Sequence, residues 1–444
     1  MKSNAYKLEI KNFGPISRCE LQLSDMTILI GPQASGKSTI SKLIYFFLNI
    51  RDEFVNFILD CADAKDAKVA TRDFGKLVRK RFLEFWGPAP QRPDVYLKFN
   101  YTDETYIEIK LDSAKHKYID PVFSKSILNE LHSVLCELMQ DSYHDSQSSN
   151  LFGTAQSISR ERARGSQVEY ILLKANKLFS LDQQLLFIPA GRSLLSTLSD
   201  QLQYIHPHQL DYTMRVFIER INKSKSFFGK SIPDLITERQ LLGNGEVWFS
   251  ATRRVEGIVK RILKGEFVHD KDGGKLYVNK NTYSKISFAS SGQQESIWIL
   301  LSLFLVVLER IDALMFIEEP EAHLFPAAQK DIVELLSFLS SAIGTKFLIT
   351  THSPYILAAM NNHIYASSVG SKNPDAVSKI IPKNSWLPFD RVSGHFISDG
   401  TLEDLRDESL MILRAELVDA ASSLINDEYD QLFEIENNGG SDAK

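Results

Sequence analysis

The stretch that is richest in chemistry lies near the start of the chain, where GPQASGKST covers residues 31–39. Glycines let backbone N–H groups turn towards an anion, and the Lys and Ser that follow the second glycine can meet phosphate oxygens and a divalent cation. The spacing predicts a phosphate-binding loop, with Lys37 on the β- and γ-phosphates of ATP and Ser38 on Mg²⁺; the alternative is a chance glycine-rich turn. The predicted nucleotide-binding residues here are Gly31, Pro32, Gln33, Ala34, Ser35, Gly36, Lys37, Ser38 and Thr39.

Acidic residues follow a second apolar run, ALMFIEEPEAHLFP at 313–326. An acid at a strand end beside a phosphate loop can hold Mg²⁺ through water, and the next acid can polarise the attacking water. We therefore assign Glu318 to the metal and Glu319 to catalysis. The alternative is that these acids form the first turn of a solvated helix, where acids are common.

A histidine ends a third apolar run, TKFLITTHSPYIL at 345–357. At the end of a neighbouring strand, His352 could donate a hydrogen bond to the γ-phosphate and take a catalytic role. Taken alone, a histidine in this setting has a local turn role just as often. Its position after the other two motifs favours the phosphate role.

The segment SFASSGQQESIWILL at 287–301 places small and polar residues at the start of an apolar helix. The hydroxyl of Ser291 and the N–H groups around Gly292 and Gln293 are predicted to form a second anion site at a helix N-terminus. One chain is not expected to bring both anion sites to one phosphate, so two chains would pair around ATP. The alternative is ordinary N-capping, for which Ser-Ser-Gly is well suited.

The elements that must position these residues can be predicted from the same pattern. We expect a strand at 26–30, a helix from about 36 to 48 and a buried helix in the apolar run 296–308. Alternation over 95–112 with a turn at 102–104 predicts a β-hairpin. A second hairpin is expected at 265–289, ahead of the Ser-Ser-Gly segment.

Composition narrows the class of protein. The chain has 444 residues, a formal net charge of −5, 43% hydrophobic residues and three widely spaced cysteines. We expect a soluble, cytoplasmic protein of two or three domains, with no disulfide framework, no secretion signal and no membrane span. A uniformly basic protein that coats nucleic acid is not expected.

The order of the motifs resembles that of ABC-type ATPases. The opening LEIKNFGPI at 8–16 is similar to the first strand of the SMC, RecF and OLD branch, and FIEEPEAHLFP with TTHSPYIL is most similar to OLD-type ATPases. Within the AAA_15 and AAA_21 group, the chain resembles the ATPase subunits of bacterial anti-phage systems, namely Septu PtuA and PARIS AriA. The resemblance covers about residues 5–370.

This resemblance implies an α/β fold: an ABC-type P-loop ATPase head with an antiparallel β subdomain, a central mostly parallel sheet and a helical insertion. No long coiled coil is expected, because the helices expected at 193–240 are too short and broken for sustained heptads. The expected division is an N-terminal ATPase part at 1–190 and a helical arm with hairpin at 191–285. A C-terminal ATPase part follows at 286–370, and a strand and helical extension at 371–444. The polar, Ser-rich stretch 141–165 is predicted to be a mobile loop.

The sequence departs from the family pattern in three places. Glu318 stands where an aspartate is usual, the D-loop aspartate is replaced near Leu324, and no clear Q-loop glutamine is found. The segment LLFIPAGRSLLS at 185–196 occupies the Q-loop place, so Arg192 is a candidate γ-phosphate sensor or arm-coupling residue. The alternative is a structural salt bridge at the domain joint.

The resemblance implies an ATPase that uses ATP and Mg²⁺, forms a head-to-head dimer or higher homo-oligomer, and controls a separately encoded nuclease in anti-phage defence. The residues after His352 show no nuclease acids, because DGTLEDLRDE at 399–408 is expected to start a capped helix. Two alternatives remain open, namely a DNA repair or recombination ATPase of RecF or SMC type, and an ATP-dependent scaffold with little hydrolysis.

The C-terminal segment 401–435 is predicted to be a helix that docks the partner. Its expected apolar side is Leu410, Ile412, Leu417 and Leu424, and its expected charged side is Glu403, Asp404, Asp419 and Asp427. The alternative is that this helix only packs on its own head.

DNA is a further candidate partner, because basic residues cluster at 76–81 and 253–261. Solvated helix faces are the commoner explanation of such clusters.

Overall fold

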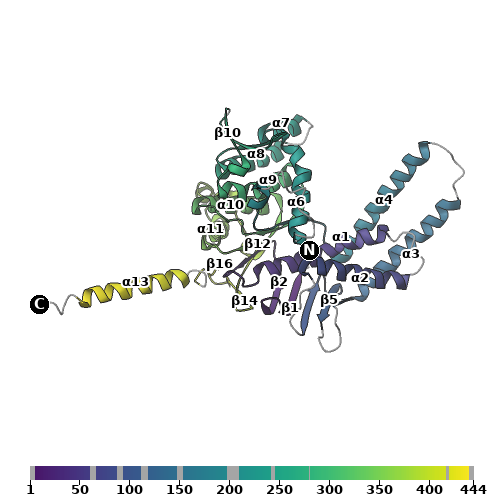
Figure 1. The fold of residues 1–444 in the computed structure, drawn as a ribbon, viewed down its shortest axis with the longest axis horizontal. Coiled ribbons are helices and arrows are strands. Elements are labelled where there is room, and N and C mark those ends of the chain that lie inside the picture. The colour runs from purple at the N-terminus through teal and green to yellow at the C-terminus, as the bar shows by residue number, and fades with distance from the viewer. Residues whose placement is uncertain are drawn as a thin grey trace.

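The computed structural model describes residues 6–60, 67–87, 94–111, 119–147, 154–197, 210–241, 246–279, 281–416 and 420–439. Its strands form a six-stranded sheet of order β14-β13-β3-β12-β11-β7 and a five-stranded sheet of order β2-β1-β4-β5-β6. Helices cover both, and a pair of long helices and a C-terminal helix extend outward (Figure 1). The expected α/β class is therefore confirmed.

The six-stranded sheet positions the predicted motifs. Its strands are β3 (Met26–Ile30), β7 (Gln184–Ile188), β11 (Ala313–Glu318), β12 (Lys346–Thr351), β13 (Val392–Ser398) and β14 (Thr401–Asp404). All of these pairings are parallel except that of β13 with β14. Ile30 lies opposite Thr351, and Thr350 lies opposite Glu318, so the carboxyl ends of β3, β12 and β11 share one edge. The predicted central, mostly parallel sheet is confirmed.

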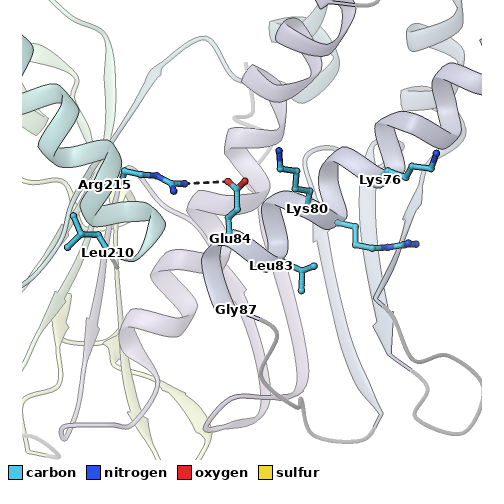
Figure 2. A pocket seen from close by; sticks show the side chains of 8 residues that line it. Lys76, Lys80, Leu83, Glu84, Gly87, Leu210 and Arg215 are labelled. Carbon is cyan, nitrogen blue, oxygen red and sulfur yellow. Dashed lines mark hydrogen bonds and ion pairs between the residues drawn. The ribbon is translucent and has the colours of Figure 1, made fainter. Parts of the chain in front are cut away.

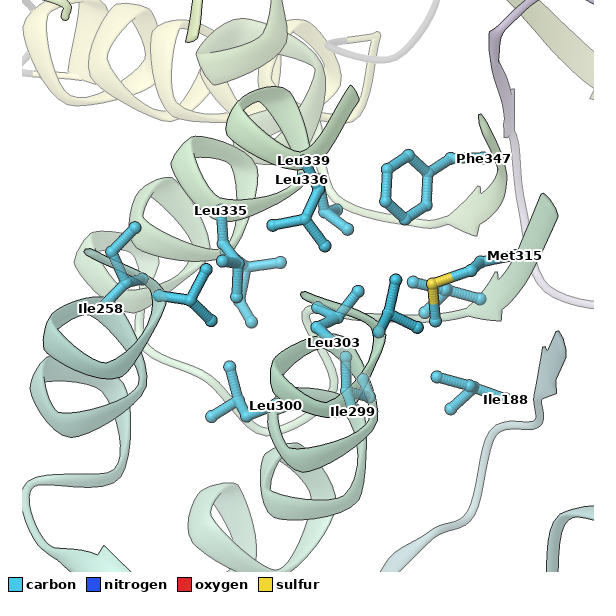
Figure 3. Packing of buried hydrophobic residues seen from close by; sticks show 14 of the residues in the cluster. Ile188, Ile258, Ile299, Leu300, Leu303, Met315, Leu335, Leu336, Leu339 and Phe347 are labelled. Carbon is cyan, nitrogen blue, oxygen red and sulfur yellow. The ribbon is translucent and has the colours of Figure 1, made fainter. Parts of the chain in front are cut away.

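Both faces of this sheet are buried, as parallel strands require. On one face the side chains of Ile188, Met315 and Phe347 meet those of helices α9 (Ser291–Leu308) and α10 (Pro326–Phe338), as Figure 3 shows. On the other face Leu29 and Phe316 join a second core with α1 (Lys37–Asp60). The apolar runs of the sequence are continuous because each strand must fill two cores.

The five-stranded sheet is the expected antiparallel β subdomain. Its strands are β1 (Lys7–Phe13), β2 (Ile16–Gln22), β4 (Val95–Asn100), β5 (Tyr106–Leu111) and β6 (Asp120–Phe123). The predicted hairpin at 95–112 is β4 with β5, and its turn is held by the Thr102 hydroxyl, which accepts from the N–H groups of Glu104 and Thr105. Helix α2 (Ala67–Trp86) packs on this subdomain through Phe82 and Trp86.

A pair of helices stands where a mobile loop was predicted. Helix α3 (Lys125–Gln147) and helix α4 (Thr154–Phe179) run side by side and project from the body (Figure 1). Residues 148–153 lie outside the described residues, and the rest of the stretch 141–165 is helical. The reason is intrinsic propensity: Arg, Glu, Ala and Gln favour helix even where no apolar face marks one.

The region 191–285 holds the expected helices and more strand than expected. The helices are α5 (Ser193–Thr197), α6 (Tyr212–Ser224), α7 (Ile232–Leu241) and α8 (Glu246–Leu263). In place of a simple hairpin, β8 (Glu266–Asp270), β9 (Gly273–Asn279) and β10 (Thr282–Lys285) form a three-stranded sheet. This sheet leads directly into the start of α9.

Helix α9 is the buried helix that the apolar run predicted. By length and composition alone it could cross a membrane, but 78% of that window is buried inside the protein. Its side chains fill the core beneath the six-stranded sheet (Figure 3).

The C-terminal region corrects the sequence prediction. Helix α11 (Pro354–Gly370) and the short α12 (Pro374–Ser378) are followed by β13, which pairs with β3, the strand before the phosphate loop. The predicted helix start at 399–408 is instead a tight turn into β14, with positive φ at Asp399 and Gly400. Asp-Gly is a strong hairpin signal because a type I′ turn needs positive φ at both residues.

The remaining C-terminal elements are β15 (Arg406–Asp407), β16 (Ile412–Leu413) and α13 (Ala420–Gly439). Leu410 and Ile412 therefore belong to a small hairpin rather than to a helix. Leu417 and Asp419 lie outside the described residues, and among the described residues of 401–435 only those from Ala420 onward are helical.

Candidate functional site

Three side chains from three strand ends meet at the edge of the parallel sheet. The Lys37 Nζ atom lies 3.3 Å from Nδ1 of His352, and the His352 Nε2 atom lies 3.2 Å from Oε1 of Glu319. Lys37 is more than 280 positions away from Glu319 and His352 in the sequence, and the parallel register brings it to them. The sheet thus brings the predicted phosphate loop, the predicted base and the predicted phosphate-sensing histidine to one place.

The loop between β3 and α1 has the backbone that its glycines predict. Gly36 has a φ of 109°, and a side chain there would overlap the side chain of Ile16. A side chain at Gly31 would overlap the carbonyl oxygen of Ile397 on β13. Glycine is therefore required at both positions, and β13 is packed directly against the phosphate loop.

Lys37 shows what kind of ligand the loop accepts. Its ammonium group donates to the carbonyl oxygens of Gly31 at 2.8 Å and Pro32 at 2.6 Å, within the loop itself. Burial lowers the pKa of Lys37 to about 8, while the nearby Glu319 and Glu321 carboxylates act in the opposite direction. A partly desolvated cation at a helix N-terminus favours an anion such as phosphate.

Glu318 fits the metal role that its position predicts. Its Oε2 atom accepts from the N–H of Ala190 at 3.1 Å, while its buried Oε1 atom has no hydrogen-bond partner among the described residues. Ser38, on the first turn of α1, is exposed. A carboxylate oxygen without a described partner and an exposed hydroxyl are oxygen ligands of the kind that Mg²⁺ takes alongside phosphate and water.

Glu319 is held in an uncommon backbone conformation. Its φ is 45°, in the left-handed region that costs a non-glycine residue roughly 1–3 kcal/mol. Its N–H donates to the carbonyl of Thr350 at 2.8 Å, and its own carbonyl accepts from Arg192 at 2.9 Å. Two contacts therefore fix the residue that carries the predicted base.

Arg192 does not have the accessibility of a phosphate sensor. Its side chain is fully buried, at 0% exposed, and donates to the carbonyl oxygens of Pro189, Glu295, Glu318 and Glu319 at 2.6–2.9 Å. Because these bonds leave its guanidinium little free donor capacity, the alternative of a structural role at the domain joint is what the structure supports. Arg192 ties the end of β7 to the end of β11 and to the first turns of α9.

The sequence reading missed the partner of Arg192. Glu295 is 3% exposed on α9, and its carboxylate accepts from the backbone N–H groups of Arg192 and Ser193, both at 3.0 Å. The Arg192 Nε atom lies 3.4 Å from Oε2 of Glu295. One signal was available, because a lone acid inside so apolar a helix needs a partner when buried.

Glu321 is a second residue that sequence reasoning missed. Its Oε1 atom accepts from the Thr351 hydroxyl at 2.6 Å and from the His352 N–H at 2.8 Å, so it holds the backbone of His352. Its Oε2 atom is buried without a hydrogen-bond partner in the described part of the chain. Burial raises the pKa of Glu321, against the lowering effect of these two hydrogen bonds.

The residues of the predicted second anion site lie at the start of α9. The helix is capped by Ser290, whose hydroxyl accepts from the N–H of Gln293, while the Gln293 side chain accepts from the N–H of Ser290. Ser290 therefore takes the capping role, and Ser291 stays exposed. Gly292 lets the first turn of α9 lie close to the backbone of His323, because a side chain at position 292 would overlap the carbonyl of His323.

The described hydrogen bonds of this segment do not reach the phosphate loop. Besides its part in the cap, the Gln293 side chain donates to the carbonyl of Leu263, and the Gln294 side chain donates to those of Ser287 and Ala289. Among the described residues, Arg192 joins α9 to this edge of the sheet, because it contacts Glu295 on α9 and the carbonyl oxygens of Glu318 and Glu319.

The basic clusters are largely paired with acids. Arg79 pairs with Asp120, Arg81 with Glu53 and Glu84, and Arg261 with Asp331 and Glu334. A hollow of about 560 Å³ lies between α2 and α6, where Arg215 pairs with Glu84 (Figure 2). These pairings favour solvated helix faces over a nucleic-acid track.

The family comparison supplies the identity of the fold. A family model described as AAA ATPase domain (AAA_15) matches residues 6–357, which is most of the chain. The chain belongs to this family. This AAA ATPase therefore carries a domain of a family of ATPases, and such ATPases bind ATP, typically with Mg²⁺.

The solved structures that match this chain include two SMC heads. An SMC head bound to the C-winged helix domain of ScpA is 12% identical, covers 92% of this chain and 99% of its own, and has a TM-score of 0.43. The SMC head domain from Thermotoga maritima is 12% identical, covers 91% of this chain and 99% of its own, and has a TM-score of 0.36. No curated protein matches this chain.

Proposed function

We propose that this AAA ATPase is an ABC-type ATP-hydrolysing subunit of a bacterial anti-phage defence complex. In this proposal two heads pair around ATP and control a separately encoded nuclease. The observation that carries the ATPase part is the continuous contact from Lys37 through His352 to Glu319 at the edge of the sheet. The defence part is supported by the likeness of the segments 316–326 and 350–357 to OLD-type ATPases and to PtuA and AriA.

The residues of the site have distinct roles in this proposal. Lys37 and the N–H groups of the loop 31–39 bind the phosphates, and Ser38 with Glu318 would hold Mg²⁺, which neutralises phosphate charge. Glu319 accepts a proton from the attacking water, and His352, beside it, orients that water or the γ-phosphate. Arg192 and Glu321 position Glu319 and His352 through their backbones.

Pairing of heads is supported by the exposed start of α9. Ser291 is exposed, and no described hydrogen bond links it to the phosphate loop of its own chain. A helix N-terminus with a free hydroxyl is an anion site, so a second head can bring it to the ATP of the first.

Mixing two inactive variants tests this pairing. Ser291→Arg blocks closure by bulk and charge, and Lys37→Ala removes phosphate binding. In a mixed dimer one composite site carries both defects and the other carries neither, so ATPase activity should return on mixing. Ser371→Arg, at an exposed serine on the far end of α11, is the matched control and should keep full activity. Proven mixed dimers without any recovery would contradict an arrangement in which one intact site suffices.

A phage challenge tests the biological role. Cells that carry the complete operon should survive phages that kill cells carrying the Lys37→Ala variant. If no phage in a broad panel is restricted and loss of the gene instead sensitises cells to DNA damage, the repair alternative replaces the defence proposal.

A further inference from the structure

Helix α13 is an exposed amphipathic helix that the ATPase site does not use. Figure 1 shows it extending from the body of the protein beyond β16. Every side chain described on it, from Ile425 to Glu436, is exposed. Five of these are large and apolar, at 53–68% exposed: Ile425, Tyr429, Leu432, Phe433 and Ile435.

These apolar side chains share one side of the helix. With 3.6 residues per turn, all five fall within an arc of about 160°. Asp427, Asp430 and Glu434 lie on the opposite side, while Glu428 and Glu436 lie on the apolar side. An apolar stripe of this kind, in full contact with water, is typical of a surface that a partner covers.

The charges on α13 decide which partner fits. The helix carries the acids Asp427, Glu428, Asp430, Glu434 and Glu436 and no Lys or Arg. A membrane surface or a nucleic acid would select basic residues, and both are disfavoured. A second copy of α13 is also disfavoured, because Glu428 and Glu436 lie within the apolar arc and would face like charges in a pair.

We infer that α13 is a docking helix for a separate protein that presents an apolar groove which also carries Lys or Arg side chains. The apolar side chains fill the groove, and its basic side chains meet Glu428 and Glu436. This inference rests on the proposed function, since it gives the separately encoded effector a place to bind.

The attachment of α13 links it to the catalytic edge. Helix α11 begins two residues after His352, and its Asn361 side chain donates to the carbonyl of Leu413 at 2.7 Å and accepts from its N–H at 2.8 Å. Leu413 ends β16, the last strand before α13. The strand that precedes α13 is thus fastened to the helix that follows the predicted phosphate-sensing histidine.

Photocrosslinking in the native cell tests the surface directly. The full chain carries p-benzoylphenylalanine in place of Tyr429 or, as a control, in place of Tyr365, which is 60% exposed on α11. We expect an adduct with another protein at position 429 and not at 365. An adduct only with this chain itself, or none, overturns the inference.

Titration of the purified adduct partner with the full chain then tests the chemistry. Leu432→Glu should weaken binding about tenfold or more, because it places a charge in the groove. The double variant Glu428→Lys with Glu436→Lys should weaken binding and remove its salt dependence, whereas Asp427→Lys on the far side should bind like wild type. Unchanged binding by Leu432→Glu, or an equal effect of Asp427→Lys, overturns the inference.

The ATPase rate separates this inference from the proposed function. The α13 variants should hydrolyse ATP like wild type, because their side chains lie outside the nucleotide site. If the crosslinked partner fits these titrations but is not a nuclease, the docking surface stands and the defence proposal fails.

Discussion

Arg192 offers the sharpest test of how this fold supports catalysis. The substitution Arg192→Ala removes the donors to four carbonyl oxygens, those of Pro189, Glu295, Glu318 and Glu319. At about 1 kcal/mol net for each hydrogen bond, the loss is about 4 kcal/mol. The substitution also leaves Glu295 buried without its cation, and breaking a buried ion pair in this way costs about 3–5 kcal/mol. The two values agree.

Urea denaturation with an ATP-binding assay on the same samples measures this effect. We expect Arg192→Ala to lose about 3–5 kcal/mol of unfolding free energy. Its turnover should fall more than its ATP affinity, since Glu319 is released while the phosphate loop remains. Arg192→Lys keeps the charge but cannot donate to four carbonyls, so its free energy of unfolding should lie between those of wild type and Arg192→Ala.

The matched control is Arg239→Ala, which removes a half-exposed ion pair with Glu309. It should cost about 0.2–1 kcal/mol. If Arg192→Ala is as stable as this control but no longer binds ATP, the structural role is refuted and Arg192 is a phosphate sensor after all.

Two further predictions follow from the same contacts. Because the pKa of Lys37 in the free protein is about 8 and phosphate needs the charged ammonium, ATP affinity should fall about tenfold between pH 7 and pH 9. Calorimetry checks this, and Lys37→Arg should bind with little dependence on pH in that range; an equally flat profile in wild type would contradict the reasoning. Glu321→Ala leaves the Thr351 hydroxyl and the His352 N–H without their acceptor, so kcat should fall about tenfold or more with a smaller change in KM. Glu321→Gln retains an acceptor oxygen and should stay close to wild type in the same steady-state assay, and equal losses in both variants would assign Glu321 a charge role instead.

The motifs could be predicted because each lies at a sharp local contrast. Continuous apolar runs end at the phosphate loop, at Glu318 and just before His352. Parallel strands bring their carboxyl ends to one edge of a sheet, so the polar residues that follow these runs could be expected to meet. The Asp-Gly turn at 399–400 carried an equally local signal, but its polar surroundings also suit a helix start. The structure has the turn, because Asp-Gly readily takes the positive φ that a type I′ turn needs at both residues.

The partners of the motifs could not be predicted, because they come from distant parts of the chain. Three of the four carbonyls that accept from Arg192 lie more than 100 residues away, and the place of β13 beside β3 depends on a strand order that no local pattern encodes. Glu321 gave a weak signal as the third acid of EEPE, yet its hydroxyl partner Thr351 lies on the neighbouring strand.

The central claim is that this edge of the sheet hydrolyses ATP with Glu319 as the base. Phosphate release at saturating ATP and Mg²⁺, measured for wild type and Glu319→Gln, tests it most directly, with Glu238→Gln on the exposed surface as the control. The account predicts that Glu319→Gln binds ATP like wild type and loses turnover by roughly 10²-fold or more, the scale of a positioned base. Equal turnover in the two proteins would contradict it.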